Sequence, residues 1–278
     1  MLSTGLQRMR SAGLFIVGQR PRGIKMWFVE YRELIKILTI SDLKVKYQSS
    51  VLGFAWSMLN PLLMMLILYL VFSNVFRTTE DQFALYLLIG VISWRFFANG
   101  TTSAINVIVK NSSLVTKIFI PREVLVLSTI LSALISSLLE FLVLIPLLIL
   151  LGAGLSPYIL FFLIIHAIYF LIVYGISLIL AALYVYYRDL DQIWNVVMQM
   201  GFFLSPVVYP LSTVPTKYID YYMLNPITGI IQMYRDVLLY HQLPQAGDIA
   251  FALTAGFSIV IIGSYVFNRF ERRFAEEI

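Results

Sequence analysis

The longest stretch without Asp, Glu, Lys or Arg covers 47 residues, from Phe141 to Tyr187. As a straight α-helix it would measure about 70 Å, more than twice the roughly 30 Å hydrocarbon core of a bilayer. The sequence Gly-Ala-Gly-Leu-Ser-Pro at 152–157 is typical of a turn and divides the stretch in two. The pattern therefore predicts two membrane-spanning helices that form a tight hairpin.

Other apolar segments fit the same interpretation, in a chain that is 60% hydrophobic and only 13% charged. We expect an all-α integral membrane protein with six transmembrane helices. The expected spans are 51–76, 83–109, 124–151, a fourth from the turn to 187, a fifth from 192 to about 205, and 249–268. The chain then divides into a cytoplasmic N-terminal segment (1–50), a membrane domain (51–268) and a cytoplasmic tail (269–278).

Basic residues are distributed unevenly between the two sides of this topology. Sixteen of the 20 Lys and Arg residues fall on the side of the termini, three fall on the other side, and Arg95 lies within a span. Cytoplasmic loops carry such an excess of basic residues, so both termini are predicted to be cytoplasmic. Orientation in a membrane also accounts for the net charge of +5 without nucleic acid.

Two segments are expected to be helical without crossing the membrane. Tyr31, Leu34, Ile35 and Leu38 recur at helical spacing opposite charged residues, which predicts an amphipathic helix in the cytoplasmic interface. The alternative is a solvated helix that packs on a partner subunit. The segment 206–240 is apolar but interrupted by prolines and charges, which predicts short re-entrant helices buried in protein.

Motifs for covalent chemistry are scarce. The sequence has no cysteine, no phosphate-binding Gly-x-x-x-x-Gly-Lys-Ser/Thr loop and no His-Glu-x-x-His site. His166 and His241 lie in separate segments. Asp189-Leu-Asp191 resembles the Asp-x-Asp metal site of nucleotide-sugar transferases, but its loop is very short, and the acids could equally cap the next helix. We therefore expect no catalytic residue, metal site or cofactor in this chain.

Arg95 and Glu140 each lie near the midpoint of a predicted span. Ionisable groups at this depth are costly and usually pair or face a polar cavity. Two interpretations remain open: an internal ion pair that joins the second span to the third, or a polar pathway through the bundle.

Seven segments, in this order, resemble permease subunits of bacterial polysaccharide ABC exporters of the type-2 class. Arg95 stands where the resemblance implies a neutral residue. The segments are SDLKVKYQSSVLGFAWSMLNP (41–61), LIGVISWRFF (88–97), KIFIPRE (117–123), YRDL (187–190), FLSPVVYP (203–210), LNPITG (224–229) and FERRFA (270–275).

The resemblance implies a homodimer of six-span subunits in the cytoplasmic membrane of a bacterium or archaeon. Two separate ATP-binding subunits would hold ATP and Mg, and the cargo would be lipid-linked polysaccharide such as O antigen of lipopolysaccharide, teichoic acid or capsule. The loop 110–123, here named the coupling segment, would dock into the ATPase. Its candidate contact residues are Lys110, Asn111, Leu114, Lys117, Pro121, Arg122 and Glu123.

The resemblance also implies a conduit at the dimer interface, lined with aromatic rings on which sugars slide. The candidates are Trp56, Tyr69, Trp94, Phe96, Phe97, Tyr209 and Tyr234, together with Arg95. The Leu52-Gly53 turn resembles the loop at the cytoplasmic gate. Lys44 and Lys46, close by, are expected either to attract the diphosphate of the lipid carrier or to anchor the chain at the membrane surface.

Two other functions compete with this one. An integral membrane glycosyltransferase or polymerase would need an acidic cluster at a membrane face, for which Asp189 and Asp191 are the candidates. An ABC exporter of another cargo, a drug or a lipid, would share the same architecture.

Overall fold

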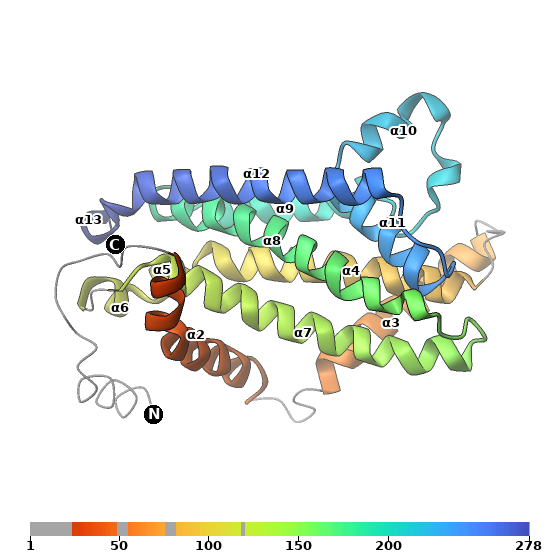
Figure 1. Cartoon of the computed structure of the whole chain (residues 1–278), viewed down its shortest axis with the longest axis horizontal. Coiled ribbons are helices and arrows are strands. Elements are labelled where there is room, and N and C mark those ends of the chain that lie inside the picture. Colours follow the sequence, from red (N-terminus) through yellow and green to blue (C-terminus); the bar gives the residue numbers. More distant parts are fainter. Residues whose placement is uncertain (1–23, 49–54, 76–81, 118–119, 278) are drawn as a thin grey trace.

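The computed structural model describes residues 24–48, 55–75, 82–117 and 120–277, and every regular element within these ranges is a helix (Figure 1). Four helices are long and apolar enough to cross a membrane. They are α4 (Phe83–Ile105), α7 (Glu123–Leu150), α8 (Phe161–Tyr186) and α12 (Ala246–Glu271). The all-helical fold is therefore confirmed, and these four helices are suited to crossing a membrane.

The predicted count of six spans is not established by length and composition. α3 (Ala55–Val75) contains the shorter apolar stretch Met58–Ser73, and α9 (Leu190–Leu204) has 15 residues. Figure 1 shows α9 running along the bundle beside α12, whereas α3 runs obliquely to the long helices, near the end where α10 and α11 lie.

The core lies along α4, which packs against α3, α7, α8, α9 and α11. Of its most apolar window 78% is buried, against 17% for α12 at the edge of the bundle. α4 is thus the central helix, and α12 presents most of its surface to the surroundings.

α12 is held mainly by α8. The two helices lie side by side toward the α13 end and diverge toward α11 (Figure 1). At their crossing, an ideal Cβ built on Gly263 would lie 2.3 Å from the carbonyl oxygen of Gly175. Small residues allow the backbones of membrane helices to approach this closely, and the gain is van der Waals contact. The two helices therefore form one closely packed pair.

The hairpin between α7 and α8 lies where the sequence predicts it. Gly152 and Gly154 adopt φ angles of +83° and +76°, a region that glycine enters at little cost. A short 3₁₀ helix η1 (Pro157–Leu160) follows, and its first turn is capped by the Ser156 side chain, which accepts a hydrogen bond from the backbone N–H of Tyr158.

α2 (Ile24–Tyr47) packs against α7 through a series of polar contacts. The Thr39 hydroxyl donates to the carbonyl of Ser128 (3.3 Å), and the Thr129 hydroxyl donates to the Asp42 carboxylate (3.2 Å). The predicted helix before the first span is therefore present and packs on its own chain, while its position at the membrane surface stays a prediction.

Short helices gather at the two ends of the bundle (Figure 1). At one end lie η2 (Leu211–Thr213), α10 (Thr216–Met223) and α11 (Pro226–Leu238), in the segment where short helices were predicted. Their depth in a membrane stays a prediction. At the other end lie α5 (Val107–Lys110), α6 (Ser112–Lys117) and α13 (Phe274–Glu277).

Candidate functional site

A row of polar residues runs along one face of α7. Ser128, Ser132, Ser136 and Glu140 follow one another at intervals of four residues, and all are buried. Residues four apart lie above one another on a helix, so these side chains form a continuous line that we name the α7 seam. Polar groups inside an apolar span usually face other protein groups or water.

Arg95 and Glu140 form a two-point ion pair at the end of the seam. The Arg95 Nε and Nη2 atoms each lie 3.3 Å from a Glu140 carboxylate oxygen, and Nη1 donates to the Asn60 side-chain oxygen at 2.8 Å. The pair therefore joins α3, α4 and α7. The Glu140 side chain is 3% exposed, whereas that of Arg95 is 23% exposed, so the guanidinium keeps access to the α3 side of the bundle.

Lys46 reaches the seam from the end of α2. The Ser136 hydroxyl donates to the Ser132 carbonyl and lies 3.3 Å from the Lys46 ammonium and 3.1 Å from the Tyr47 hydroxyl. Because Ser136 precedes Glu140 by one helical turn, Lys46 and Arg95 place two positive charges along one line. Lys44 is exposed on the same helix, and Leu52 and Gly53 lie outside the described residues.

The carboxyl group of Asp42 lies beside Thr129, at the end of the α7 seam that begins with Ser128. Burial raises the pKa of Asp42 above its usual value, and this effect outweighs the Thr129 hydrogen bond and the positive charge of Lys110, which lower it.

Four of the predicted conduit aromatics lie inside the single chain. Trp94, Phe96, Phe97 and Tyr234 are each covered by other side chains. The Tyr234 hydroxyl lies 2.6 Å from the Nδ1 atom of His166, whose ring stacks on Phe96 with centroids 4.9 Å apart. Phe96 and Tyr234 thus meet at His166 between α4, α8 and α11, whereas the Trp94 ring packs against Gly201 and Phe202 of α9. Any contact with cargo stays a prediction for these rings.

The other predicted aromatics lie nearer the surface. Trp56 and Tyr69 on α3 are 48% and 39% exposed, and Tyr209 is partly buried with its hydroxyl donating to the carbonyl of Phe203 (2.9 Å). The structure thus divides the predicted set into buried and accessible rings.

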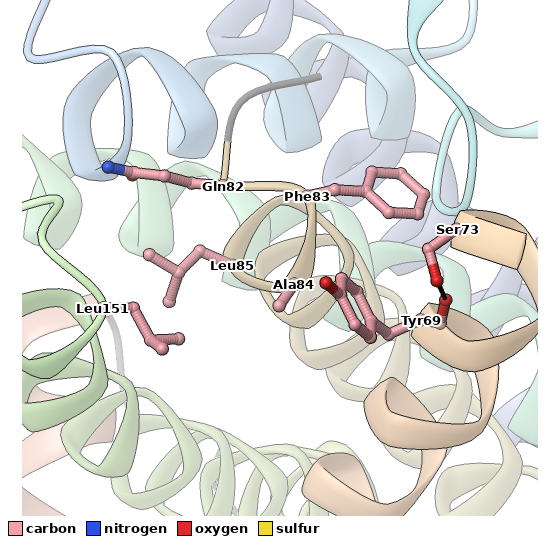
Figure 2. Close-up of a pocket in the computed structure, with 7 residues that line it drawn as sticks. All are labelled: Tyr69, Ser73, Gln82, Phe83, Ala84, Leu85 and Leu151. Atoms are coloured by element: carbon pink, nitrogen blue, oxygen red, sulfur yellow. Dashed lines mark hydrogen bonds between the residues drawn. The ribbon is translucent and has the colours of Figure 1, made fainter. Parts of the chain in front are cut away.

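A pocket of about 300 Å³ opens beside Tyr69 (Figure 2). It lies between the end of α3 and the start of α4, close to the α7–α8 hairpin. Figure 2 shows the Tyr69 ring and the Phe83 ring on its wall, with the Ser73 hydroxyl bonded to the Tyr69 carbonyl. The lining residues are Tyr69, Ser73, Gln82, Phe83, Ala84, Leu85 and Leu151.

Arg235 of α11 is a structural centre that the sequence interpretation missed. Its side chain is fully buried, and its Nη1 and Nη2 atoms donate to the carbonyls of Pro206 (2.8 Å) and Val207 (2.9 Å). Its guanidinium carbon lies 3.4 Å from the centre of the Tyr86 ring. Arg235 therefore binds carbonyl groups freed where α9 ends. One feature of the sequence could have indicated this role: Arg235 is a basic residue in an apolar segment whose prolines interrupt helices and leave carbonyl groups without partners.

The coupling segment lies at the end of the bundle opposite α10 and α11 (Figure 1). Lys110 is exposed, the Asn111 side chain donates to the carbonyl of Val107 (2.8 Å), and Leu114 packs against the core. Pro121, Arg122 and Glu123 are partly buried. The backbone of Lys117 ends α6, and its side chain lies outside the described part of the chain.

The Asp189 and Asp191 carboxylates do not assemble a metal site with other described residues. Within the described ranges, no group of three or more His, Cys, Asp or Glu side chains could hold a metal ion. Asp189 occupies the position before α9 without a side-chain cap bond, and Asp191 accepts a hydrogen bond from the backbone N–H of Gln192 (2.8 Å).

Comparison with known proteins decides the family. The family model of the ABC-2 type transporter matches residues 33–239, which is most of the chain and includes the α7 seam and the coupling segment. The chain belongs to the ABC-2 type transporter family. Membership establishes it as the membrane component of an ABC transporter, working with an ATP-binding subunit, and it agrees with the absence of a phosphate-binding loop from the sequence.

Relatives of this ABC-2 chain carry names of export proteins. An O-antigen export system permease protein of Klebsiella pneumoniae is 31% identical over 249 residues, 88% of this chain and 94% of the relative. A permease of the same name from Myxococcus xanthus is 29% identical over 255 residues, 90% of this chain and 96% of the relative. The polysialic acid transport protein KpsM of Escherichia coli is 25% identical over 212 residues, 74% and 81% of the two chains. These relatives are transport proteins, which favours transport over the glycosyltransferase alternative.

Proposed function

We propose that this chain is the membrane subunit of an ABC exporter that moves lipid-linked polysaccharide outward across a bacterial cytoplasmic membrane. Hydrolysis of ATP, with Mg, takes place in a separate subunit. The observation that carries the proposal is the nearly full-length similarity to permeases named for O-antigen export. The accessible positive charges of Lys46 and Arg95 along the α7 seam suit a cargo that carries phosphate.

Six crossings follow if α3 and α9 join the four long helices. α3 has 21 residues, about 31 Å as a helix, which matches the hydrocarbon core. α9 is shorter, and α10 and α11 continue from its end as re-entrant helices. An even number of crossings, with the basic flanks on one side, places both termini in the cytoplasm.

The α3 face is the proposed wall of the conduit. Asn60 is exposed there, and Arg95 is reachable beside it in the middle of the span. A guanidinium that faced lipid at this depth would be costly, so this face is better suited to water or a second copy of the chain. We therefore propose a homodimer with the conduit between the two α3 faces, served by two ATP-binding subunits.

The accessible residues on this face supply the proposed cargo contacts. Trp56 and Tyr69 offer ring faces to sugars, while Lys46 and Arg95 offer positive charge to the phosphates of the lipid carrier. Behind this wall, the buried Trp94 ring packs α4 against α9, and the buried Tyr234 ring packs α11 against α7 and α8.

Substitution of Lys46 tests whether the cargo is lipid-linked polysaccharide. In a reconstituted complex of this chain and its ATP-binding subunit, lipid-linked polysaccharide is expected to stimulate ATP hydrolysis. Lys46→Gln removes a charge from the seam and should raise the half-maximal stimulating concentration about tenfold, the usual effect of one charge-assisted hydrogen bond. Lys36→Gln is the control, because Lys36 is exposed on the same helix and away from the seam.

Two outcomes would contradict the proposal. Stimulation by an unrelated drug or a phospholipid, with none by the polysaccharide, would favour the alternative exporter of another cargo. Equal effects of the Lys46 and Lys36 substitutions would remove the seam from the cargo path.

A further inference from the structure

The end of α12 contacts the coupling segment, although about 145 residues separate them in the sequence. The backbone N–H of Arg122 donates to the Glu271 carboxylate (3.4 Å), and the Arg122 guanidinium donates to the Glu271 carbonyl. One turn earlier on α12, the Asn268 amide donates to the Glu123 carboxylate (3.1 Å). Glu271 is buried, which is unusual for a carboxylate near the end of a chain.

A cluster of aromatic rings packs against this contact. The Phe274 ring is fully buried, edge-on to Phe267 with centroids 5.4 Å apart, and the Arg122 guanidinium lies 5.8 Å from its centre. From α8, the Tyr186 hydroxyl donates to the carbonyl of Phe270 (3.1 Å). Figure 1 shows α13 beside α6 at this end of the bundle.

These contacts change how a displacement of the coupling segment would spread. Through the backbone the segment is joined to α4 and α7 alone. Through Asn268 and Glu271 it is also joined to α12, and α12 is closely packed on α8 at Gly175 and Gly263. Closely packed helices move together, because packed cores transmit strain.

We propose that Asn268, Glu271 and Phe274 form a C-terminal strut that passes movement of the coupling segment to the α8–α12 pair. They are positioning residues, and the strut stays closed throughout the transport cycle. The inference rests on the proposed docking of the coupling segment to the ATP-binding subunit. It extends beyond the family match, which ends at residue 239, before α12 begins.

Substitution of Glu271 separates positioning from simple assembly. Glu271→Ala removes the acceptor for the Arg122 N–H, and we expect polysaccharide-stimulated ATP hydrolysis and transport to fall about tenfold, with basal hydrolysis and subunit assembly retained. Glu271→Gln keeps a side-chain oxygen as acceptor and should restore most of the coupling. Glu277→Ala is the control in the same tail, because there the backbone carbonyl, not the side chain, accepts the Arg188 hydrogen bond.

A cross-link between positions 123 and 268 tests whether this contact of the strut persists throughout the transport cycle. The sequence has no cysteine, so Glu123→Cys with Asn268→Cys introduces a single thiol pair. This variant lacks the 3.1 Å hydrogen bond and should couple poorly, and bridging the pair with a short, reducible bifunctional thiosulfonate should restore transport. If the bridge instead stops transport and reduction restores it, the contact must open during the cycle and the strut is wrong. A Glu271→Ala complex that transports at the wild-type rate would also overturn it.

The controls distinguish failure of the strut from failure of the proposed function. If polysaccharide stimulates no ATP hydrolysis even in the unchanged complex, the proposed function fails. If stimulation is normal but Lys110→Glu, at an exposed position of the coupling segment, leaves coupling unchanged, the docking assignment fails. If Lys110→Glu uncouples the complex and Glu271→Ala does not, the strut alone fails.

Discussion

Glu140→Ala is expected to lower the free energy of unfolding by about 3–5 kcal/mol, because it leaves the Arg95 guanidinium in the middle of the bundle without its carboxylate. The loss should appear as a lower midpoint in thermal or denaturant unfolding of the protein in detergent micelles. Leu142→Ala is the matched control on α7: that side chain is 58% exposed toward the surroundings, so little change is expected.

Charge reversal tests the pairing directly. Arg95→Glu combined with Glu140→Arg should recover part of the stability lost in either single reversal, because the exchanged charges again face each other. Replacing both residues with leucine should recover stability as well, since an apolar pair needs no partner, but it should impair transport if Arg95 contacts the cargo. A double reversal that is no more stable than Glu140→Arg alone would contradict the ion pair.

Gly263→Leu is the second substitution with a large expected effect. Its side chain would meet the Gly175 carbonyl, a backbone atom that cannot rotate away, so α8 and α12 must separate. Overpacking commonly costs about 1–3 kcal/mol, and we expect the upper end of that range here. Gly247→Leu tests the same change on the same helix, where an added Cβ meets nothing within 4 Å. The close crossing is wrong if unfolding in micelles shows the two variants to be equally stable.

The lengths of the helices could be predicted because bilayer thickness fixes them. The expected spans 124–151 and 249–268 correspond to Glu123–Leu150 and Ala246–Glu271, and the turn at Gly152 separates α7 from α8 as expected. Depth follows from length in the same way, which is why Arg95 and Glu140 could be placed at one level. Whether they face each other depends on the rotation of each helix about its axis, which the sequence left open.

The lateral arrangement of the helices could not be predicted. Lipid tails are as apolar as a protein core, so composition does not distinguish the central helix α4 from the peripheral helix α12. Composition therefore does not tell whether Trp94, Phe96 and Phe97 face a neighbouring helix of the same chain, and only the structure shows that they are covered on α4. The burial of Arg235 could not be predicted either, because the carbonyls that accept its hydrogen bonds belong to residues 28 and 29 positions earlier and are brought to it only by the fold.

Translocation in vesicles tests the central claim most directly: that this subunit provides a path for lipid-linked polysaccharide and takes its energy from another chain. Membrane vesicles would contain this chain and its ATP-binding subunit, with labelled lipid-linked polysaccharide on the ATP-accessible side. We expect the label to cross only when both subunits and ATP are present. Crossing driven by this chain alone, hydrolysis of nucleotide by the purified chain, or ATP hydrolysis without any movement of the polysaccharide would contradict the account.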